Sequence, residues 1–279
     1  MPNITWYLIL TSGSVLLFIF TLWKSFIPRA RTLYVFLFTC GLSYIFEFVI
    51  KVLFNSYDYY PYIFNNKWYD SIFGAVVSQG IAVPTIAMCI VSFRLNVLWV
   101  IGFCLLLMGI EMLFLRLDIY VHHWWKTIYT GTFTFIGFYL ARWWDGLMLN
   151  RKQWVDWVNI YLILVFISNT IVYLLKTVAK SHLFHIGVFQ DPVRDSVFIE
   201  ALFIFIHSIV VSFMIQRKWG WFWFIGMYLV DGIVVALYEK IGLVQFFGFW
   251  NPALFACLPL VVALLVYWVY GQLTNRLTK

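Results

Sequence analysis

Residues 97–115, VLWVIGFCLLLMGIEMLFL, form an apolar run of 19 residues with one charged side chain, Glu111. An α-helix needs about 20 mostly apolar residues to cross the hydrocarbon core of a bilayer. Within that core every backbone N–H and C=O must be hydrogen-bonded inside the protein, and a helix satisfies its own. This run therefore predicts a membrane-spanning helix.

Similar runs recur along the whole chain. Nine segments have the length and apolar character of a span: 6–26, 33–53, 71–93, 97–115, 127–143, 155–175, 196–215, 219–237 and 252–270. Over the 279 residues, 63% are hydrophobic and only 11% are charged, whereas about 25% of the residues of a soluble domain are charged. We therefore expect an all-α fold, a polytopic transmembrane bundle of about nine helices with the lipid bilayer as its main partner.

Basic residues gather in alternate connections between these runs. They are Lys24, Arg29, Arg31, Arg94, Arg142, Arg151, Lys152, Arg217, Lys218, Arg276 and Lys279. Cytoplasmic connections of membrane proteins are enriched in Lys and Arg, which also explains the net charge of +7 without nucleic-acid binding. The pattern predicts a multi-pass protein of the cell membrane, with an uncleaved first helix, the N-terminus outside and the C-terminus in the cytoplasm.

The chain also repeats itself. Residues 70–73, DSIF, match residues 195–198, DSVF, at an offset of 125, and residues 99–102, WVIG, match 223–226, WFIG, at 124. Lys51 and Lys176 are likewise 125 residues apart. We expect an N-terminal helix in 1–30, a four-helix repeat in 31–150 and a second in 151–279. Because each repeat has an even number of spans, the two would be parallel, as in some transporters.

Carboxylates inside the spans are the candidate functional residues, because a charge in hydrocarbon usually faces the protein interior or water. The four are Glu47, Glu111, Glu200 and Asp231, all expected at a similar depth in the outer third of the bilayer. One interpretation is a shared cavity that attracts cations. The other is local pairing, since Glu47 precedes Lys51 by the four residues that favour an ion pair on a helix.

Two further features lie within the spans, a histidine and a proline. His207 follows Glu200 by seven residues on the same helical face, so the pair could relay protons, although such a His is often packed and hydrogen-bonded. Pro84 follows Ser78-Gln79-Gly80 and predicts a kink in the third span. Discontinuous helices line some transport sites, yet Pro and Gly are also ordinary in membrane helices.

Metal and catalytic signals are weak. Four histidines lie in outer connections, but their spacing is too loose for us to predict a metal site: His122, His123, His182 and His185. No nucleophile elbow, phosphate-binding loop or zinc-protease motif is present. We therefore predict no catalytic residue and no cofactor, and an enzyme is the least favoured class.

One stretch has a recognisable pattern. It runs from Ile110-Glu111 through residues 122–126, HHWWK, to Tyr129, and weaker parts of the same pattern lie in 55–70 and 241–251. This resembles an uncharacterised family of small multi-pass membrane proteins of spore-forming Gram-positive bacteria. The resemblance implies a bacterial membrane protein and assigns no catalytic residue. In the second half Ala236 stands where the pattern has its Glu.

Two functional hypotheses follow. The first is a transporter or channel-like protein for a small solute or cation, with a polar cavity between the two repeats. The alternative is a structural or accessory membrane subunit, whose acids pair locally and whose partners are other membrane subunits. The two differ in whether the four carboxylates face a common cavity.

Overall fold

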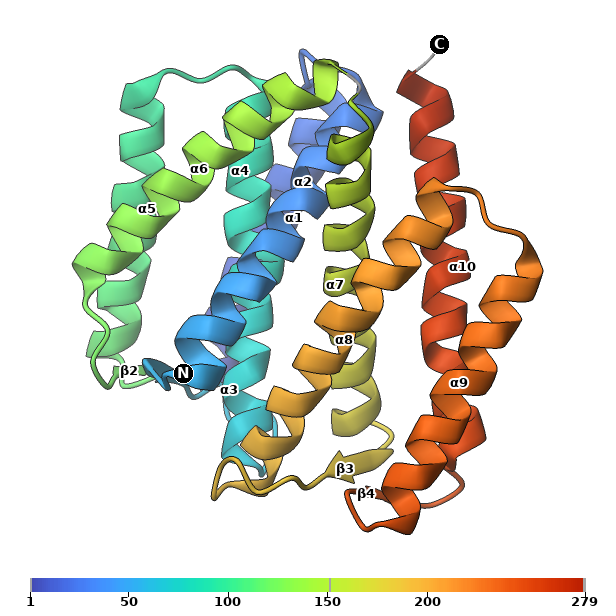
Figure 1. Cartoon of the computed structure of the whole chain (residues 1–279). Helices are drawn as coiled ribbons and strands as arrows, with labels where there is room; N and C mark the ends of the chain where they lie inside the picture. Colours follow the sequence, from blue (N-terminus) through green and yellow to red (C-terminus); the bar gives the residue numbers. More distant parts are fainter. Residues whose placement is uncertain (1, 151, 278–279) are drawn as a thin grey trace. The chain divides into compact units, whose positions relative to one another are not determined.

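The computed structural model describes residues 2–150 and 152–277, and it is 77% helical (Figure 1). Arg151 and Lys279, which contribute to the predicted orientation, lie outside the described residues. Eight helical stretches are long and apolar enough to cross a membrane: Asn3–Lys24, Arg29–Leu53, Lys67–Ser92, Val97–Arg116, Gln153–Thr177, Pro192–Gln216, Trp221–Lys240 and Pro252–Gln272. The chain is therefore an all-α, multi-pass membrane protein.

The fifth expected span differs from the other eight. It forms helix α6, Thr127–Leu149, which is 23 residues long. This helix contains Arg142 and Asp145 and many threonine, tyrosine and tryptophan residues, so it is less apolar than the other long helices. A ninth span stays a prediction.

The helices belong to two compact units, which are described separately. Unit 1 comprises residues 1–155 with 273–279, and unit 2 comprises 156–272. Unit 1 contains α1 (Asn3–Lys24), α2 (Arg29–Glu47), η1 (Phe48–Leu53), β1 (Tyr57–Tyr59), α3 (Lys67–Ala75), η2 (Val76–Ala82), α4 (Val83–Ser92), α5 (Val97–Arg116), β2 (Tyr120–His122) and α6. Unit 2 contains most of α7 (Gln153–Thr177), then β3 (His182–Phe184), α8 (Pro192–Gln216), α9 (Trp221–Lys240), β4 (Val244–Phe246) and most of α10 (Pro252–Leu277).

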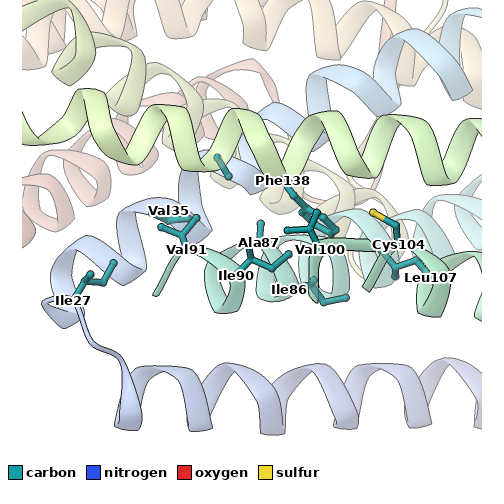
Figure 2. Packing of buried hydrophobic residues seen from close by; sticks show 11 residues of the cluster. Ile27, Val35, Ile86, Ala87, Ile90, Val91, Val100, Cys104, Leu107 and Phe138 are labelled. Carbon is teal, nitrogen blue, oxygen red and sulfur yellow. The ribbon is translucent and has the colours of Figure 1, made fainter. Parts of the chain in front are cut away.

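Helix α4 lies at the centre of unit 1, where it packs against α1, α2 and α6. All nine of its residues from Pro84 to Ser92 are buried. Figure 2 shows Ala87, Ile90 and Val91 of this helix in one apolar cluster with Val35 of α2 and Phe138 of α6. Small residues such as Ala87 let helix backbones approach closely, and van der Waals packing of this kind contributes to helix association in lipid.

Two π-helical segments interrupt the helices of unit 1. Segment η1 directly follows α2, and η2 connects α3 to α4. Ser78, Gln79 and Gly80 lie within η2, and Pro84 is the second residue of the helix that follows it. A π-helical segment interrupts the regular α-helical pattern of backbone hydrogen bonds, and such segments occur frequently at functional sites. The predicted kink at Pro84 stays a prediction, but the helix is irregular one turn before it.

Each unit has a short antiparallel sheet beside its helices. Strand β1 pairs with β2 in unit 1, with Tyr57 opposite His122, and β3 pairs with β4 in unit 2, with His182 opposite Phe246. A serine near the start of a helix holds the first strand of each pair. Ser71 Oγ accepts a hydrogen bond from Tyr59 N at 2.9 Å. Ser196 Oγ accepts one from the backbone N of residue 184 at 2.8 Å.

An aspartate anchors the loop that precedes each of these serines. Asp70 accepts hydrogen bonds from the backbone N–H groups of residues 62, 63 and 64. Asp195 accepts four, from residues 186 to 189, at 2.6–3.1 Å. Both carboxylates are buried. Because loop N–H groups have no partner in a helix or sheet, these aspartates fix the path of the loops.

Candidate functional site: a cavity with an acidic end

A cavity of about 270 Å³ lies inside unit 1, with walls from α2, η2, α5 and α6. Most of its lining is apolar or aromatic. Its polar lining includes Tyr59, Ser78, Gln79, Glu111, Trp125 and Thr130. A mostly apolar cavity with a few convergent polar groups is typical of a small-molecule site.

Glu111 is the charged residue of this lining. Its Oε1 lies 2.8 Å from His122 Nε2, and its Oε2 accepts a hydrogen bond from the Thr130 hydroxyl. Trp125 Nε1 in turn donates to Thr130 Oγ1 at 2.8 Å. These contacts from β2 and α6 hold the carboxylate in place, while it has no Lys or Arg partner among the described residues.

Glu47 is the last residue of α2, and it reaches the same cavity through one neighbour. Tyr57, which lines the cavity, donates its hydroxyl to Glu47 Oε2 at 2.6 Å. The other carboxylate oxygen, Oε1, is buried and accepts no hydrogen bond from the described residues. A buried oxygen without a donor is costly when the carboxylate is charged.

Lys51 is fully buried, and its hydrogen bonds go elsewhere than to Glu47. Its ammonium donates to Tyr57 O at 3.0 Å, to Asp58 Oδ1 at 3.0 Å and to the Ser71 hydroxyl at 2.5 Å. An ammonium has three N–H donors, so these contacts use all of them. Helical spacing suggests an ion pair between Glu47 and Lys51. In the structure the Lys51 ammonium instead contacts strand β1 and Ser71.

Asp58 completes this cluster outside the spans. Burial acts to raise the pKa of its carboxyl, but the charge of Lys51 and hydrogen bonds from His123, Lys51 and Ser71 outweigh burial and lower the pKa. Asp58 is therefore ionised at neutral pH and balances Lys51. Burial also raises the pKa of Tyr57, and the nearby charge of Glu47 raises it further, so this phenol stays neutral.

Glu200 has a different environment in unit 2. Lys176 Nζ donates to both of its oxygens at 2.8 and 2.9 Å, and Ser196 donates to Oε1 at 2.8 Å. His182 Nε2 lies 3.1 Å from the same oxygen, without the geometry of a hydrogen bond. Glu200 lines a cavity of about 250 Å³ within unit 2. An ammonium thus neutralises the acid of this second cavity.

Asp231 and His207 form a pair in unit 2. The Asp231 carboxylate lies 3.0 Å from His207 Nε2, and His207 lines the same cavity as Glu200. The residue in direct contact with His207 is therefore Asp231. A proton relay through His207 stays a prediction.

The structure gives each of the four predicted carboxylates a partner in its own unit. Glu47 and Glu111 border the unit 1 cavity, Glu200 lines the unit 2 cavity, and Asp231 is bound to a residue of that lining. A cavity common to all four stays a prediction. Residues that the sequence did not single out as site residues include Tyr57, Asp58, Thr130 and Lys176. Only Lys176 had a signal, its match with Lys51.

The histidines of the chain are all close to carboxylates. The pairs are His122 with Glu111, His123 with Asp58, His182 with Glu200, His185 with Asp195, and His207 with Asp231. Within residues 2–150 and 152–277, no three His, Cys, Asp or Glu side chains are grouped as a metal site would require. Three of these contacts, those of His122, His123 and His207, are hydrogen bonds to the carboxylate.

Comparisons with protein-family models, with curated proteins and with solved structures find no match to this chain. The chain is a multi-pass membrane protein in which each unit has a cavity with a carboxylate in its lining.

Proposed function

We propose that the chain binds a small organic cation in the cavity of unit 1 and acts as a transporter or channel-like protein for that solute. One observation carries the proposal. Glu111 is a fixed carboxylate on the wall of a mostly apolar cavity, without a Lys or Arg partner among the described residues. A cation that enters would supply the missing charge.

The charge count around the cavity favours a cation over an anion. The Asp58 carboxylate and the Lys51 ammonium balance each other. Glu111 in the lining is then the fixed negative charge, and Glu47, which contacts the lining residue Tyr57, adds a second one whenever it is ionised. The lining also offers the ring faces of Tyr59, Tyr120 and Trp125, and aromatic faces attract cations.

The proposed transport role rests on the tandem repeat. Ser71 and Ser196, 125 residues apart, bind backbone N–H groups that are also 125 residues apart, those of residues 59 and 184. Lys51 and Lys176, at the same offset, both donate to these serines. These correspondences support a first helix in 1–30 followed by parallel repeats in 31–150 and 151–279, an arrangement found in transporters.

The same proposal includes nine spans, because α6 is counted as a span in addition to the eight apolar helices. The protein would lie in the cell membrane of a spore-forming bacterium, as the resemblance implies. The N-terminus is then outside and the C-terminus cytoplasmic. A reporter enzyme that works only in the cytoplasm tests this orientation when it is fused after Lys279, and we expect the fusion to be active. An inactive fusion, together with activity of a second reporter that works only outside the cytoplasm, would contradict both the span count and the orientation.

A structural or accessory membrane subunit is the second candidate. It is favoured by the local partners of the four carboxylates, above all the two hydrogen bonds from Lys176 to Glu200. Such a subunit would bind no organic cation and would instead be isolated together with other membrane proteins.

Binding of three matched probes distinguishes these candidates. Benzylamine, benzyl alcohol and benzoate share one ring and carry a positive, neutral or negative head at neutral pH. We expect the purified protein in lipid nanodiscs to bind benzylamine most tightly, as measured by calorimetry. Glu111→Gln should weaken benzylamine binding roughly tenfold or more, because a hydrogen bond to a charged group is worth about 1.5–3 kcal/mol. Benzyl alcohol binding should change little.

Gly137 offers a second variant that leaves every charge in place. It lines the cavity, and a Cβ atom added there meets nothing within 4 Å. Gly137→Leu should therefore fill the cavity and abolish benzylamine binding while the protein stays folded. Gly102→Leu is the matched control, because Gly102 is an exposed residue of α5 with equal space and is absent from the cavity lining.

The outcomes separate binding from transport. Uptake of benzylamine into proteoliposomes that is lost in Gly137→Leu supports the transporter. Equal binding of all three probes, or benzylamine binding unchanged in both Glu111→Gln and Gly137→Leu, would overturn the cation site and leave the accessory subunit.

A further inference from the structure

Two acids lie at the unit 1 cavity, Glu111 in its lining and the half-buried Glu47 behind the lining residue Tyr57, and only Glu111 has a contact at both oxygens. Glu111 has a contact at each oxygen, from His122 and Thr130. Glu47 has one contact, from Tyr57 to Oε2, and its Oε1 is buried without a donor among the described residues. The two acids therefore differ in how well they can hold a negative charge in a dry environment.

The Lys51 ammonium attracts the Glu47 carboxylate through space but makes no hydrogen bond to it. Lys51 lies close by in η1, but its three donors bind Tyr57 O, Asp58 and Ser71. Tyr57, Tyr59 and Tyr120 are neutral phenols, and Glu111 is a second acid. An ionised Glu47 would thus be a buried charge whose nearest ammonium already balances Asp58.

Nothing in the helix geometry requires a carboxylate at this position. At the offset of 125 that relates Lys51 to Lys176, Val172 of α7 corresponds to Glu47. Unit 2 does keep a buried acid, Glu200, but Lys176 donates two hydrogen bonds to it. A buried acid that lacks this compensation indicates a functional role.

We propose that Glu47 is the proton site of the unit 1 cavity. When the cavity is empty, Glu47 carries a proton; when an organic cation binds, the O–H bond of Glu47 breaks and the proton leaves to bulk water. The cation then compensates the carboxylate, so one positive charge replaces another at constant net charge. This inference rests on the proposed cation site and makes the protein an exchanger of organic cations for protons.

The test measures protons released on binding. Benzylamine is titrated calorimetrically into the wild-type protein in nanodiscs at about pH 7, in buffers with different ionisation enthalpies. We expect about one proton released per benzylamine bound. Glu47→Gln is isosteric and keeps an oxygen that accepts the Tyr57 hydroxyl, so it should bind benzylamine with no proton release.

Two controls locate the proton. Glu239→Gln removes an exposed carboxylate of α9 and should leave the release unchanged. His122→Asn removes a titratable group that contacts Glu111 and should weaken benzylamine binding, but the number of protons released per benzylamine that still binds should stay the same. Loss of release in His122→Asn, or equal release in wild type and Glu47→Gln, would overturn the assignment to Glu47. Binding without proton release in the wild type would overturn the exchange but keep the cation site. No benzylamine binding at all would overturn both.

Discussion

Lys176→Met should destabilise unit 2 by about 3–5 kcal/mol, because it leaves Glu200 as a buried carboxylate without its ammonium. Lys176 is 3% exposed and Glu200 is 6% exposed. Their direct contacts are the two hydrogen bonds at 2.8 and 2.9 Å. The free energy of unfolding in mixed micelles, titrated with SDS, measures the loss.

A double variant tests whether the loss of stability comes from the unpaired charge of Glu200. Lys176→Met combined with Glu200→Met removes both charges and replaces them with apolar side chains of similar volume. We expect it to recover most of the lost stability, because replacing a whole buried ion pair is often neutral. Lys240→Met, at an exposed position at the end of α9, is the control and should change stability by less than about 0.5 kcal/mol. If the double variant were as unstable as the single one, a stranded charge would not be the cause.

Asp195→Ala should cost about 2–4 kcal/mol, since it removes the acceptor of four backbone N–H groups at once. Asp195 is fully buried at the start of α8, so water cannot easily take its place. We expect amide hydrogen exchange of residues 186–189 to accelerate sharply, together with a lower free energy of unfolding.

Asp191→Ala is the matched comparison for this variant. Asp191 caps α8 through the N–H groups of residues 193 and 194, both at 2.9 Å. Loss of an N-cap costs about 1 kcal/mol, and it should leave the exchange of residues 186–189 unchanged. If Asp195→Ala proved no more harmful than Asp191→Ala, the loop would be held by something other than Asp195.

The partners of the two acids at the unit 1 cavity depend on contacts between segments that are distant in the sequence. Glu111 was predicted from the sequence as a charge in an apolar run, but its contact with Thr130 joins α5 to α6. In one of the two interpretations of the sequence, Glu47 pairs with Lys51 because of their helical spacing. Instead, the helix continues as the π-helical segment η1, and the Lys51 ammonium binds β1 and Ser71. Helical spacing predicts neighbours only while the helix is regular.

The membrane class and the alternation of polar and apolar segments follow from the sequence alone, because an apolar run of about 20 residues is a local property that is sufficient to place a helix in lipid. The sequence also predicts a repeat from the match of residues 70–73 with 195–198, and these segments supply the aspartates that anchor the loops and the serines that bind the strands. Which acid has an ammonium partner became known from the packing of the helices alone. Lys176 of α7 donates a hydrogen bond to Glu200 of α8 and neutralises it. Lys51 donates to Asp58, and Glu47 Oε1 stays buried without a hydrogen bond from the described residues. Such partners are set by which helix faces pack together, and hydropathy does not encode that choice.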